Sequence, residues 1–380
     1  MASAVAGAHQ TASSIQLKRG RETLRRQYIE QGLLQDPEKR IDLKRAIRFV
    51  GTCQDMCPEF EREEREYQKS IDKYEQLANA KHRIDHTRAV KTFHRPAAGN
   101  EQPLPCDVRP PPVLERTLRY LIHDIVAVHG IEDTHFFVRD RMRSIRQDYT
   151  LQNERGPSAI AVHEQIARFH IACTHLLCES SGFSESQEME QLRKGTRSPM
   201  VTRLMLQSLQ EFYDDALIAG IECPNEAEFR SYYLVAHLGD KDVLRQAQYY
   251  RPQVYQSPMV QQALRFHSLY QRSGSFITVN MARFFRTVAH PATTFLTACM
   301  LEHFFINVRK HSLFSLCASV NIKQRPAVAI PQFAAMFGFT DNEELLKFCA
   351  YYGLTVTDSK VMLSTPQVQA EQASRLAIAQ

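Results

Sequence analysis

Between residue 113 and about residue 320, apolar residues recur at every third or fourth position in one segment after another. Val113, Leu114, Leu118 and Leu121 begin the series, and this spacing places apolar side chains on one face of an α-helix. Short breaks separate the segments, so we expect successive helices of roughly 10–18 residues. The clearest of them cover residues 163–178, 200–219, 226–237, 240–249, 258–272 and 291–309.

This pattern predicts a mainly α fold in which pairs of helices stack into an α-solenoid. A compact, irregular helical bundle is the alternative, because no strict sequence period marks the repeats. No run of about 18 apolar residues occurs, and a helix needs about that length to cross a bilayer. We therefore expect no membrane insertion.

The end of the chain carries a different pattern. We expect a helix over 311–320, a strand over 327–330, and helices over 331–337 and 343–352, the last opened by a capping box at residues 340–343. Apolar residues then alternate on both sides of a turn at residues 357–360, which is typical of a β-hairpin. Helix, strand, helix, helix and hairpin follow one another in a winged-helix domain, so the sequence predicts a winged helix here.

The first 112 residues are less regular. Pro58 suits the first position of a helix, and Phe60, Tyr67, Ile71 and Tyr74 would form its narrow apolar stripe. Residues 94–112 hold six prolines, which predict an extended connector. The sequence predicts five segments. Residues 1–50 form a flexible basic arm, with one helix near residues 21–34, and residues 51–112 form a signature helix and a proline-rich connector. A helical-repeat domain (113–275), the winged-helix end (276–365) and a tail (366–380) follow.

Charge is unevenly distributed. Residues 1–50 and residues 260–363 each carry ten Lys or Arg against five Asp or Glu, whereas residues 51–259 carry 26 against 31. Two basic ends on an acidic middle indicate an anionic partner that the ends contact.

Few residues suggest catalysis or a metal site. The nine cysteines are an odd number without paired spacing, which fits reduced thiols in the nucleus or cytosol. Cys53 and Cys57 are the candidate metal ligands, with His82 and His86 as the other two ligands that could be imagined, but a zinc site needs a second pair, and the next cysteine, Cys106, lies across the proline-rich connector. No nucleophile elbow, phosphate loop or dinucleotide fingerprint occurs. We therefore predict a protein without enzyme activity, cofactor or metal.

Two groups of residues remain open to two interpretations. His163 and His170 share one helix face with apolar neighbours, which favours packing histidines over a catalytic base. Arg139, Arg143 and Arg146 share another face, close to Asp140 and Asp148. An ion-pair network between helices is favoured there, and a contact to phosphate or to an acidic partner is the alternative.

The predicted winged helix carries the candidate contacts to other molecules. Basic residues there can bind phosphates without reading sequence; they are Lys310, Lys323, Arg325, Lys347 and Lys360. The helix over 343–352 is more apolar than a groove-reading helix requires, which predicts a protein partner as well. The candidate partner-binding residues are Phe337, Phe348 and Tyr351.

A series of motifs resembles one known family, the Sac-three/GANP (germinal-centre-associated nuclear protein) family. The series begins with Gly51-Thr52-Cys53-x-Asp55-Met56-Cys57-Pro58-Glu59, then Arg62 and Glu66. Further matches follow in order: Leu104-Pro105, Arg109-Pro110, Val113-Leu114, Arg143-x-Ile145-Arg146-x-Asp148-x-Thr150-x-Gln152, Arg168-Phe169-His170-Ile171, Glu226-Ala227-Glu228-Phe229 and Gly353-Leu354-Thr355-Val356. The resemblance covers residues 48–364.

The resemblance implies a scaffold subunit of the transcription-and-export complex two, which couples transcription to mRNA export at nuclear pores. It implies a PCI-like module of stacked helix pairs that ends in a winged helix. The implied partners are a second PCI-domain subunit, a small acidic DSS-type protein, RNA or DNA bound without strong sequence preference, and a DEAD-box mRNA-export ATPase. The implied structural signature comprises Cys53, Asp55, Met56, Cys57, Pro58, Arg143, Arg146 and Asp148.

Two alternatives accompany this hypothesis. The first is a subunit that only docks proteins, either a centrosomal member of the family or a proteasome-lid or signalosome-like PCI subunit. The second is an enzyme that uses the chemistry of Cys53 and Cys57. Further regions of the family are absent, so we expect a middle fragment or a short member.

Overall fold

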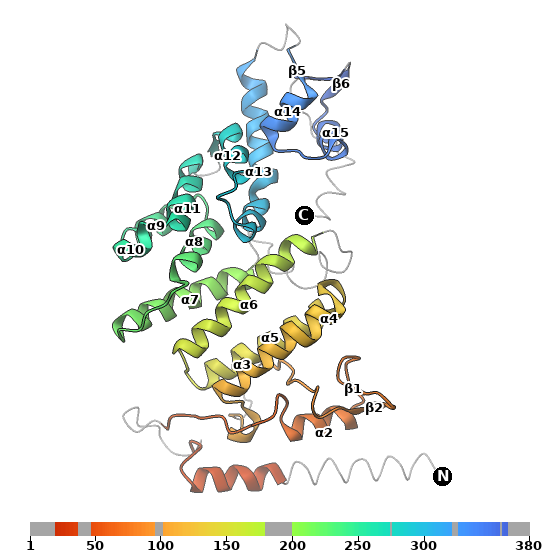
Figure 1. The fold of residues 1–380 in the computed structure, drawn as a ribbon, viewed down its shortest axis with the longest axis vertical. Coiled ribbons are helices and arrows are strands. Elements are labelled where there is room, and N and C mark those ends of the chain that lie inside the picture. The colour runs from red at the N-terminus through yellow and green to blue at the C-terminus, as the bar shows by residue number, and fades with distance from the viewer. Residues whose placement is uncertain are drawn as a thin grey trace. The chain divides into compact units, whose positions relative to one another are not determined.

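The computed structural model describes residues 20–36, 47–95, 102–178, 200–273, 276–320, 326–357 and 359–363. Helices hold most of these residues and the strands are short (Figure 1), so the predicted mainly α fold is confirmed. In the described part, no helix combines the length and the apolar composition needed to cross a bilayer.

Contacts divide the chain into two compact units. One lies within Met1–Ile166 and Ile218–Ile221, and the other within Ala167–Leu217 and Glu222–Gln380. The five segments predicted from the sequence remain predictions.

The first unit begins with a helix over residues 20–30, close to the helix expected near 21–34. Arg21 donates a hydrogen bond to Asp107 at 3.0 Å, and Leu34 is buried against Phe49, Leu104 and Val108. The described part of the predicted flexible arm is therefore packed. Residues 1–19 and 37–46 lie outside the described residues.

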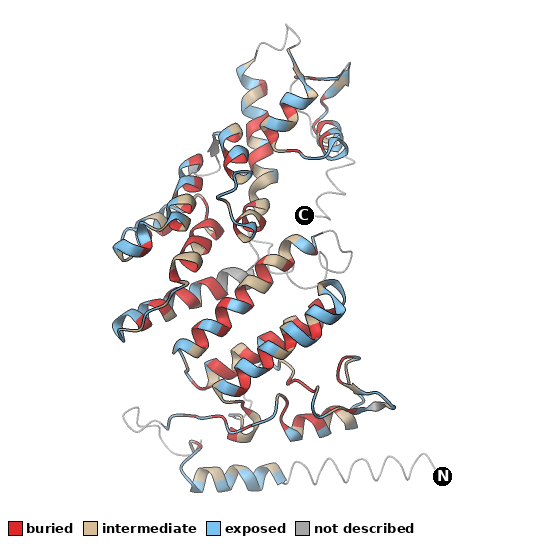
Figure 2. Cartoon of the chain, in the orientation of Figure 1, coloured by how far each residue is buried: buried red, intermediate tan, exposed pale blue. Residues whose placement is uncertain are grey.

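The remaining elements of this unit are mostly helices. They are α2 (Glu59–Tyr67), β1 (Gln76–Leu77), β2 (Ala80–Ile84), the 3-10 turn η2 (Pro105–Asp107), α3 (Pro111–Tyr120), the π-helical η3 (Leu121–Val126), α4 (Ala127–His129), α5 (Ile131–Leu151) and the first half of α6 (Pro157–Leu176). Gly130 separates α4 from α5 because its φ of +82° lies in a region that favours glycine. Buried and exposed residues alternate along α5 (Figure 2).

The predicted apolar stripe on α2 is wrong. The helix ends at Tyr67, which is exposed, and Pro58 is its N-cap rather than its first residue. The residues that α2 buries are charged: Glu61, Arg62 and Arg65. A hydrophobicity pattern cannot identify this face because the burial depends on partners from other segments.

The proline-rich connector is only partly extended. Pro105 lies in η2, and Pro111 and Pro112 open α3, where a missing N–H costs nothing. Val108 and Arg109 are fully buried. Part of this segment, including Leu104, Val108 and Arg109, therefore belongs to the core of the first unit.

The second unit starts in the second half of α6. It continues with α7 (Met200–Ile218), α8 (Glu226–Ala236), α9 (Lys241–Ala247), α10 (Pro252–Tyr255), α11 (Pro258–Leu269), the hairpin β3 (Tyr270–Ser273) and β4 (Phe276–Val279), and α12 (Met281–Val288). The expected helices over 200–219, 226–237 and 240–249 agree with α7, α8 and α9. The expected helix over 258–272 is too long, because its last residues form β3.

The end of the second unit combines helices with a small sheet. Its elements are α13 (Phe295–Ser319), β5 (Ala327–Ala329), α14 (Ile330–Phe337), α15 (Asn342–Tyr351), β6 (Thr355–Thr357) and β7 (Lys360–Met362). The strands form one antiparallel sheet in the order β5-β7-β6. Two predicted helices, over 291–309 and 311–320, form the single helix α13.

The start of α15 and the β6–β7 turn differ in detail from the prediction. Asp341, and not Thr340, caps α15, since its carboxylate accepts hydrogen bonds from the backbone of Glu343 and Glu344. The β6–β7 turn needs a residue with positive φ, and Ser359 supplies it at +64°. The turn therefore forms without the Asn-Gly pair that most often marks a hairpin.

Candidate functional site

A buried ionic cluster centred on Asp148 joins the motifs of the first unit. The Asp148 carboxylate, fully buried on α5, accepts hydrogen bonds from Lys91 Nζ at 2.7 Å and from Arg109 Nε at 2.7 Å. Arg109 also donates to Ser144 Oγ at 2.7 Å and to the Met56 carbonyl at 3.1 Å. The burial of these charges is tolerated because each is paired and hydrogen-bonded.

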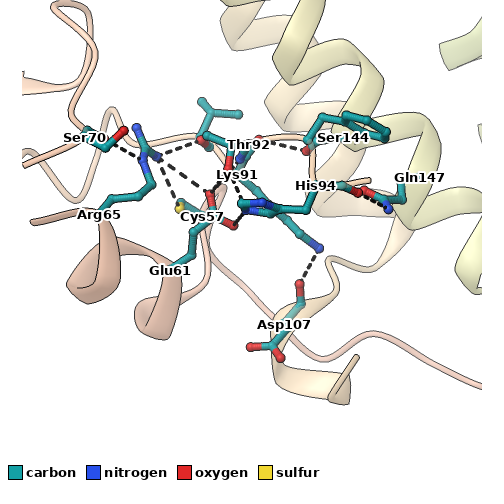
Figure 3. A network of polar contacts seen from close by, with 12 residues as sticks. Cys57, Glu61, Arg65, Ser70, Lys91, Thr92, His94, Asp107, Ser144 and Gln147 are labelled. Atoms are coloured by element: carbon teal, nitrogen blue, oxygen red, sulfur yellow. Dashed lines mark hydrogen bonds and ion pairs between the residues drawn. The ribbon is translucent and has the colours of Figure 1, made fainter. Parts of the chain in front are cut away.

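Further contacts extend this cluster into the segment before α2. The Gln152 side chain donates to the Arg109 carbonyl at 2.9 Å and accepts from the Gly51 N–H at 3.0 Å. Figure 3 shows Lys91 reaching the Asp107 carbonyl and Ser144 reaching the Lys91 carbonyl. Three segments distant in sequence, around residues 51–56, 91 and 107–109, are therefore fixed to one helix.

A second buried carboxylate, that of Glu75, forms ion pairs on the neighbouring side of the first unit. It forms ion pairs with Arg65 of α2 and with Arg141 of α5, the latter at 2.9 Å. It also accepts from the Val90 N–H at 2.8 Å. One anion between two arginines explains why α2 can bury a charged face.

Cys57 lies beside this second cluster. Its side chain is fully buried, and its sulfur is 4.0 Å from Arg65 (Figure 3). Burial raises the pKa of the Cys57 thiol well above its usual range, and burial likewise raises the pKa of Cys53. Both cysteines therefore stay protonated, which suits packing and not nucleophilic attack.

The remaining residues of the predicted signature have separate positions. Pro58 is buried and Met56 half-buried. Asp55 is exposed and accepts a hydrogen bond from Arg62 at 2.9 Å.

The candidate metal ligands suggested by the sequence form no metal site among the described residues. Cys53 Sγ donates to the Asp55 carbonyl at 3.4 Å. His86 is exposed, and the side chain of His82 lies outside the described residues. No group of three His, Cys, Asp or Glu side chains in the described ranges could hold a metal ion.

The arginines of α5 do not all have the same role: some belong to an ion-pair network and others do not. Arg141 belongs to the ion-pair network. Arg143 instead stacks on Phe93, with 3.9 Å from its guanidinium carbon to the ring centroid. Burial, and then Arg143, lowers the pKa of Arg146 to about 10. Asp148 pairs with Lys91 and Arg109, and not with an arginine of its own helix.

The two histidines of α6 are buried, as their apolar neighbours predict. The ring Nδ1 of His163 is 2.7 Å from the Ala159 carbonyl, and burial lowers the pKa of His163 to about 4. A histidine in this environment is a packing residue.

In the second unit, two further motifs meet. Arg168 of α6 donates two hydrogen bonds to Glu228 of α8, at 2.9 Å and 2.7 Å. The Arg168 guanidinium also lies over the Phe229 ring, 4.9 Å from its centroid. The paired sequence motifs therefore hold α6 against α8.

The predicted nucleic-acid contacts at the end of the chain are only partly described. Lys310 of α13, Lys347 of α15 and Lys360 of β7 are exposed, whereas Lys323 and Arg325 lie outside the described residues. Lys347 is 3.8 Å from Glu343 on the same helix, and Glu344 is the next residue. The exposed face of α15 therefore carries two carboxylates beside its single described cation.

The three predicted partner-binding residues differ in exposure. Phe337 is fully buried and stacks on Phe333 at 4.2 Å between ring centroids. Its side chain is therefore part of the core. Phe348 and Tyr351 are half-buried, and the neighbouring Leu346 is 45% exposed, so α15 keeps an accessible apolar edge.

The motifs fixed by these clusters match one family model. The model of the SAC3/GANP family matches residues 56–358. The chain belongs to the SAC3/GANP family. It is 46% identical over 361 residues to SAC3 family protein 1 of Schizosaccharomyces pombe, covering 92% of this chain and 34% of that protein.

Two other relatives are more distant. Protein xmas of Drosophila melanogaster is 33% identical over 327 residues, covering 83% of this chain and 15% of that protein. SAC3 family protein B of Arabidopsis thaliana is 31% identical over 325 residues, covering 81% of this chain and 18% of that protein. The chain thus spans about a third or less of the length of these SAC3/GANP relatives.

Several residues of these clusters have no local signal in the sequence. Glu75 and Lys91 belong to no motif named above, and their role depends on contacts with distant segments. Arg109 and Gln152 are in the motif series, and their shared partner Asp148 explains why the motifs occur together. Arg309 is buried, donates to the Phe337 carbonyl at 3.0 Å and pairs with Glu344 at 2.7 Å. It therefore fixes α13 to the elements that follow.

Proposed function

We propose that this chain is a non-enzymatic scaffold of a nuclear mRNA-export assembly and acts at nuclear pores. The observation that carries the proposal is membership of the SAC3/GANP family over most of the chain. The buried, protonated cysteines and the packing histidine support a structural role, because none of them is an activated nucleophile or base.

We also propose that the described helices form a PCI-like module that ends in a winged helix. Support comes from the sheet β5-β7-β6 with α13, α14 and α15 in the expected order. The winged helix docks a second PCI-domain subunit, itself braced by a small acidic DSS-type protein. Phe348, Tyr351 and Leu346 supply the apolar contacts on α15, and a DEAD-box mRNA-export ATPase is a further partner.

The nucleic-acid part of the proposal depends on the exposed cations of this end. Lys310, Lys347 and Lys360 are accessible, and together with Lys323 and Arg325 they would bind RNA or DNA phosphates without reading sequence. The second candidate is a subunit that only docks proteins. Glu343 favours it, because its carboxylate lies 3.8 Å from Lys347 Nζ and offsets the charge that would attract phosphate.

A co-purification tests the scaffold. The tagged full chain is captured from nuclear extract and the bound proteins are identified by mass spectrometry. We expect a PCI-domain protein and a small acidic protein in near-equal amounts. Replacement of Leu346 and Tyr351 by Glu should remove both, whereas Lys241→Glu on the exposed side of α9 should retain them. Recovery of neither protein by the unaltered chain would refute the proposed scaffold.

A further inference from the structure

A groove between α11 and α12 is lined by arginines. Its volume is about 640 Å³, within the range of roughly 300–1,000 Å³ that holds ligands. Arg265 projects from α11, Arg283 and Arg286 from α12, and His290 follows α12. All of these residues belong to the second unit.

The polar groups of the groove are mainly hydrogen-bond donors. Arg265, Arg283 and Arg286 are exposed, and the described residues give them no ion pair. The ring Nδ1 of His290 accepts from the Ala292 N–H at 3.1 Å, so in the neutral ring Nε2 carries the proton. Asn280 Oδ1 accepts from the Arg283 N–H at 3.3 Å, which leaves the Asn280 amide group as a donor.

No described Asp or Glu lines this groove. Three guanidinium groups around one depression repel one another unless an anion lies between them. Arginine binds phosphate through two parallel N–H groups, which makes phosphate the anion that fits this arrangement. The groove therefore contrasts with α15, where Glu343 lies 3.8 Å from Lys347.

We infer that the α11–α12 groove binds the phosphate backbone of RNA or DNA. The inference deepens the nucleic-acid part of the proposed function by moving a main contact away from α15 to α11 and α12. Residues 260–363, which contain the three groove arginines, carry twice as many basic as acidic residues, and such a field attracts a polyanion. The groove lining contains no aromatic ring other than that of His290, so binding depends on phosphate contacts and has little base preference.

Binding of a fluorescent 20-nucleotide single-stranded RNA to the purified full chain tests the inference. Anisotropy titrations at three salt concentrations give the affinity and its salt slope. Each lost phosphate contact reduces the slope by about 0.7 for a single strand, so Arg283→Gln with Arg286→Gln should reduce it by about 1.4. If the affinities of the variant and the unaltered chain are equal at 1 M salt, a slope smaller by 1.4 means about 25-fold weaker binding at 100 mM salt.

Two further variants locate the contact. Arg265→Gln removes one cation from the opposite side of the groove and should weaken binding about fivefold by the same reasoning. Lys241→Gln with Arg245→Gln removes two exposed cations from α9 of the same unit. This control matches the charge change of the α12 pair and should leave the affinity within about twofold. All of these positions are exposed, so unchanged circular dichroism melting curves are expected.

The outcomes separate the groove from the wider proposal. Weaker binding by the α12 pair with an unaffected α9 control supports the groove. Equal weakening by both pairs shows a general charge effect and overturns it. Unchanged binding by the α12 pair, with weakening by Lys310→Gln, Lys347→Gln and Lys360→Gln together, overturns the groove and leaves the proposed function. No RNA binding by the unaltered chain at low salt overturns both.

Discussion

Asp148→Asn should strongly destabilise the first unit. The carboxylate accepts three hydrogen bonds, two from Arg109 and one from Lys91. The asparagine amide keeps one oxygen but places an NH2 group against one of these donors. Two cations that are 10% exposed or less then lose their counterion. Removal of one partner from a buried ion pair costs about 3–5 kcal/mol, and we expect a loss of this size.

Urea unfolding followed by circular dichroism measures this loss. Arg146→Gln is the matched control on the same helix, because Arg146 is close to Asp148 in sequence but forms no described ion pair with it. We expect its free energy of unfolding not to fall, because burial lowers the pKa of Arg146 and so disfavours the charge that this variant removes. Lys91→Met, added to Asp148→Asn, should restore part of the lost free energy of unfolding, since it removes one of the two cations without a counterion. A cost below about 1 kcal/mol for Asp148→Asn would refute the central role of this carboxylate.

Three further outcomes are expected. Gly51→Ala should destabilise the protein by about 1–3 kcal/mol or more, because the new methyl group would lie 2.4 Å from the Val108 carbonyl oxygen. Gly20→Ala is the control, since its methyl group meets nothing within 4 Å. Parallel urea titrations compare the free energies of unfolding of the two variants. His163 stays neutral in the folded protein, since burial lowers its pKa to about 4, so stability is lost as pH falls from the unfolded pKa of about 6.5 towards 4. The loss should reach about 2 kcal/mol at pH 5, and His163→Gln should flatten this pH dependence in urea titrations at pH 7 and 5. Arg309→Met should lower the melting temperature by several degrees, because it leaves two carbonyl acceptors of residues 337 and 338 unpaired; an unchanged melting temperature would contradict this role.

Periodic apolar spacing predicted most helices because their burial follows from their own sequence. α7 and α8 agree with the prediction within a few residues. The prediction failed at α2, where Glu61, Arg62 and Arg65 are buried. Arg65 pairs with Glu75 and Glu61 accepts a hydrogen bond from Thr92, and both partners lie in later segments. A pattern of hydrophobicity within one helix contains no information about such partners.

Fewer residues of the candidate site were predicted from the sequence, again because their roles depend on partners in distant segments. The motif containing Asp148 was identified, but its partners Lys91 and Arg109 are 57 and 39 residues away. Lys347 was selected as an exposed cation, and it is exposed, but Glu343 on the same helix lies 3.8 Å from it and offsets its charge. The groove arginines were missed because α12 was not expected as a helix, and α11 was expected to continue to residue 272.

The most direct test of the scaffold is reconstitution of the assembly from purified components. The full chain is mixed with a PCI-domain subunit, a small acidic DSS-type protein and a labelled single-stranded RNA. Size-exclusion chromatography with light scattering then gives the mass of each complex. We expect one peak that contains the three proteins in equal amounts and carries the RNA. Separate elution of this chain from the PCI-domain subunit would show that the chain is not the proposed scaffold.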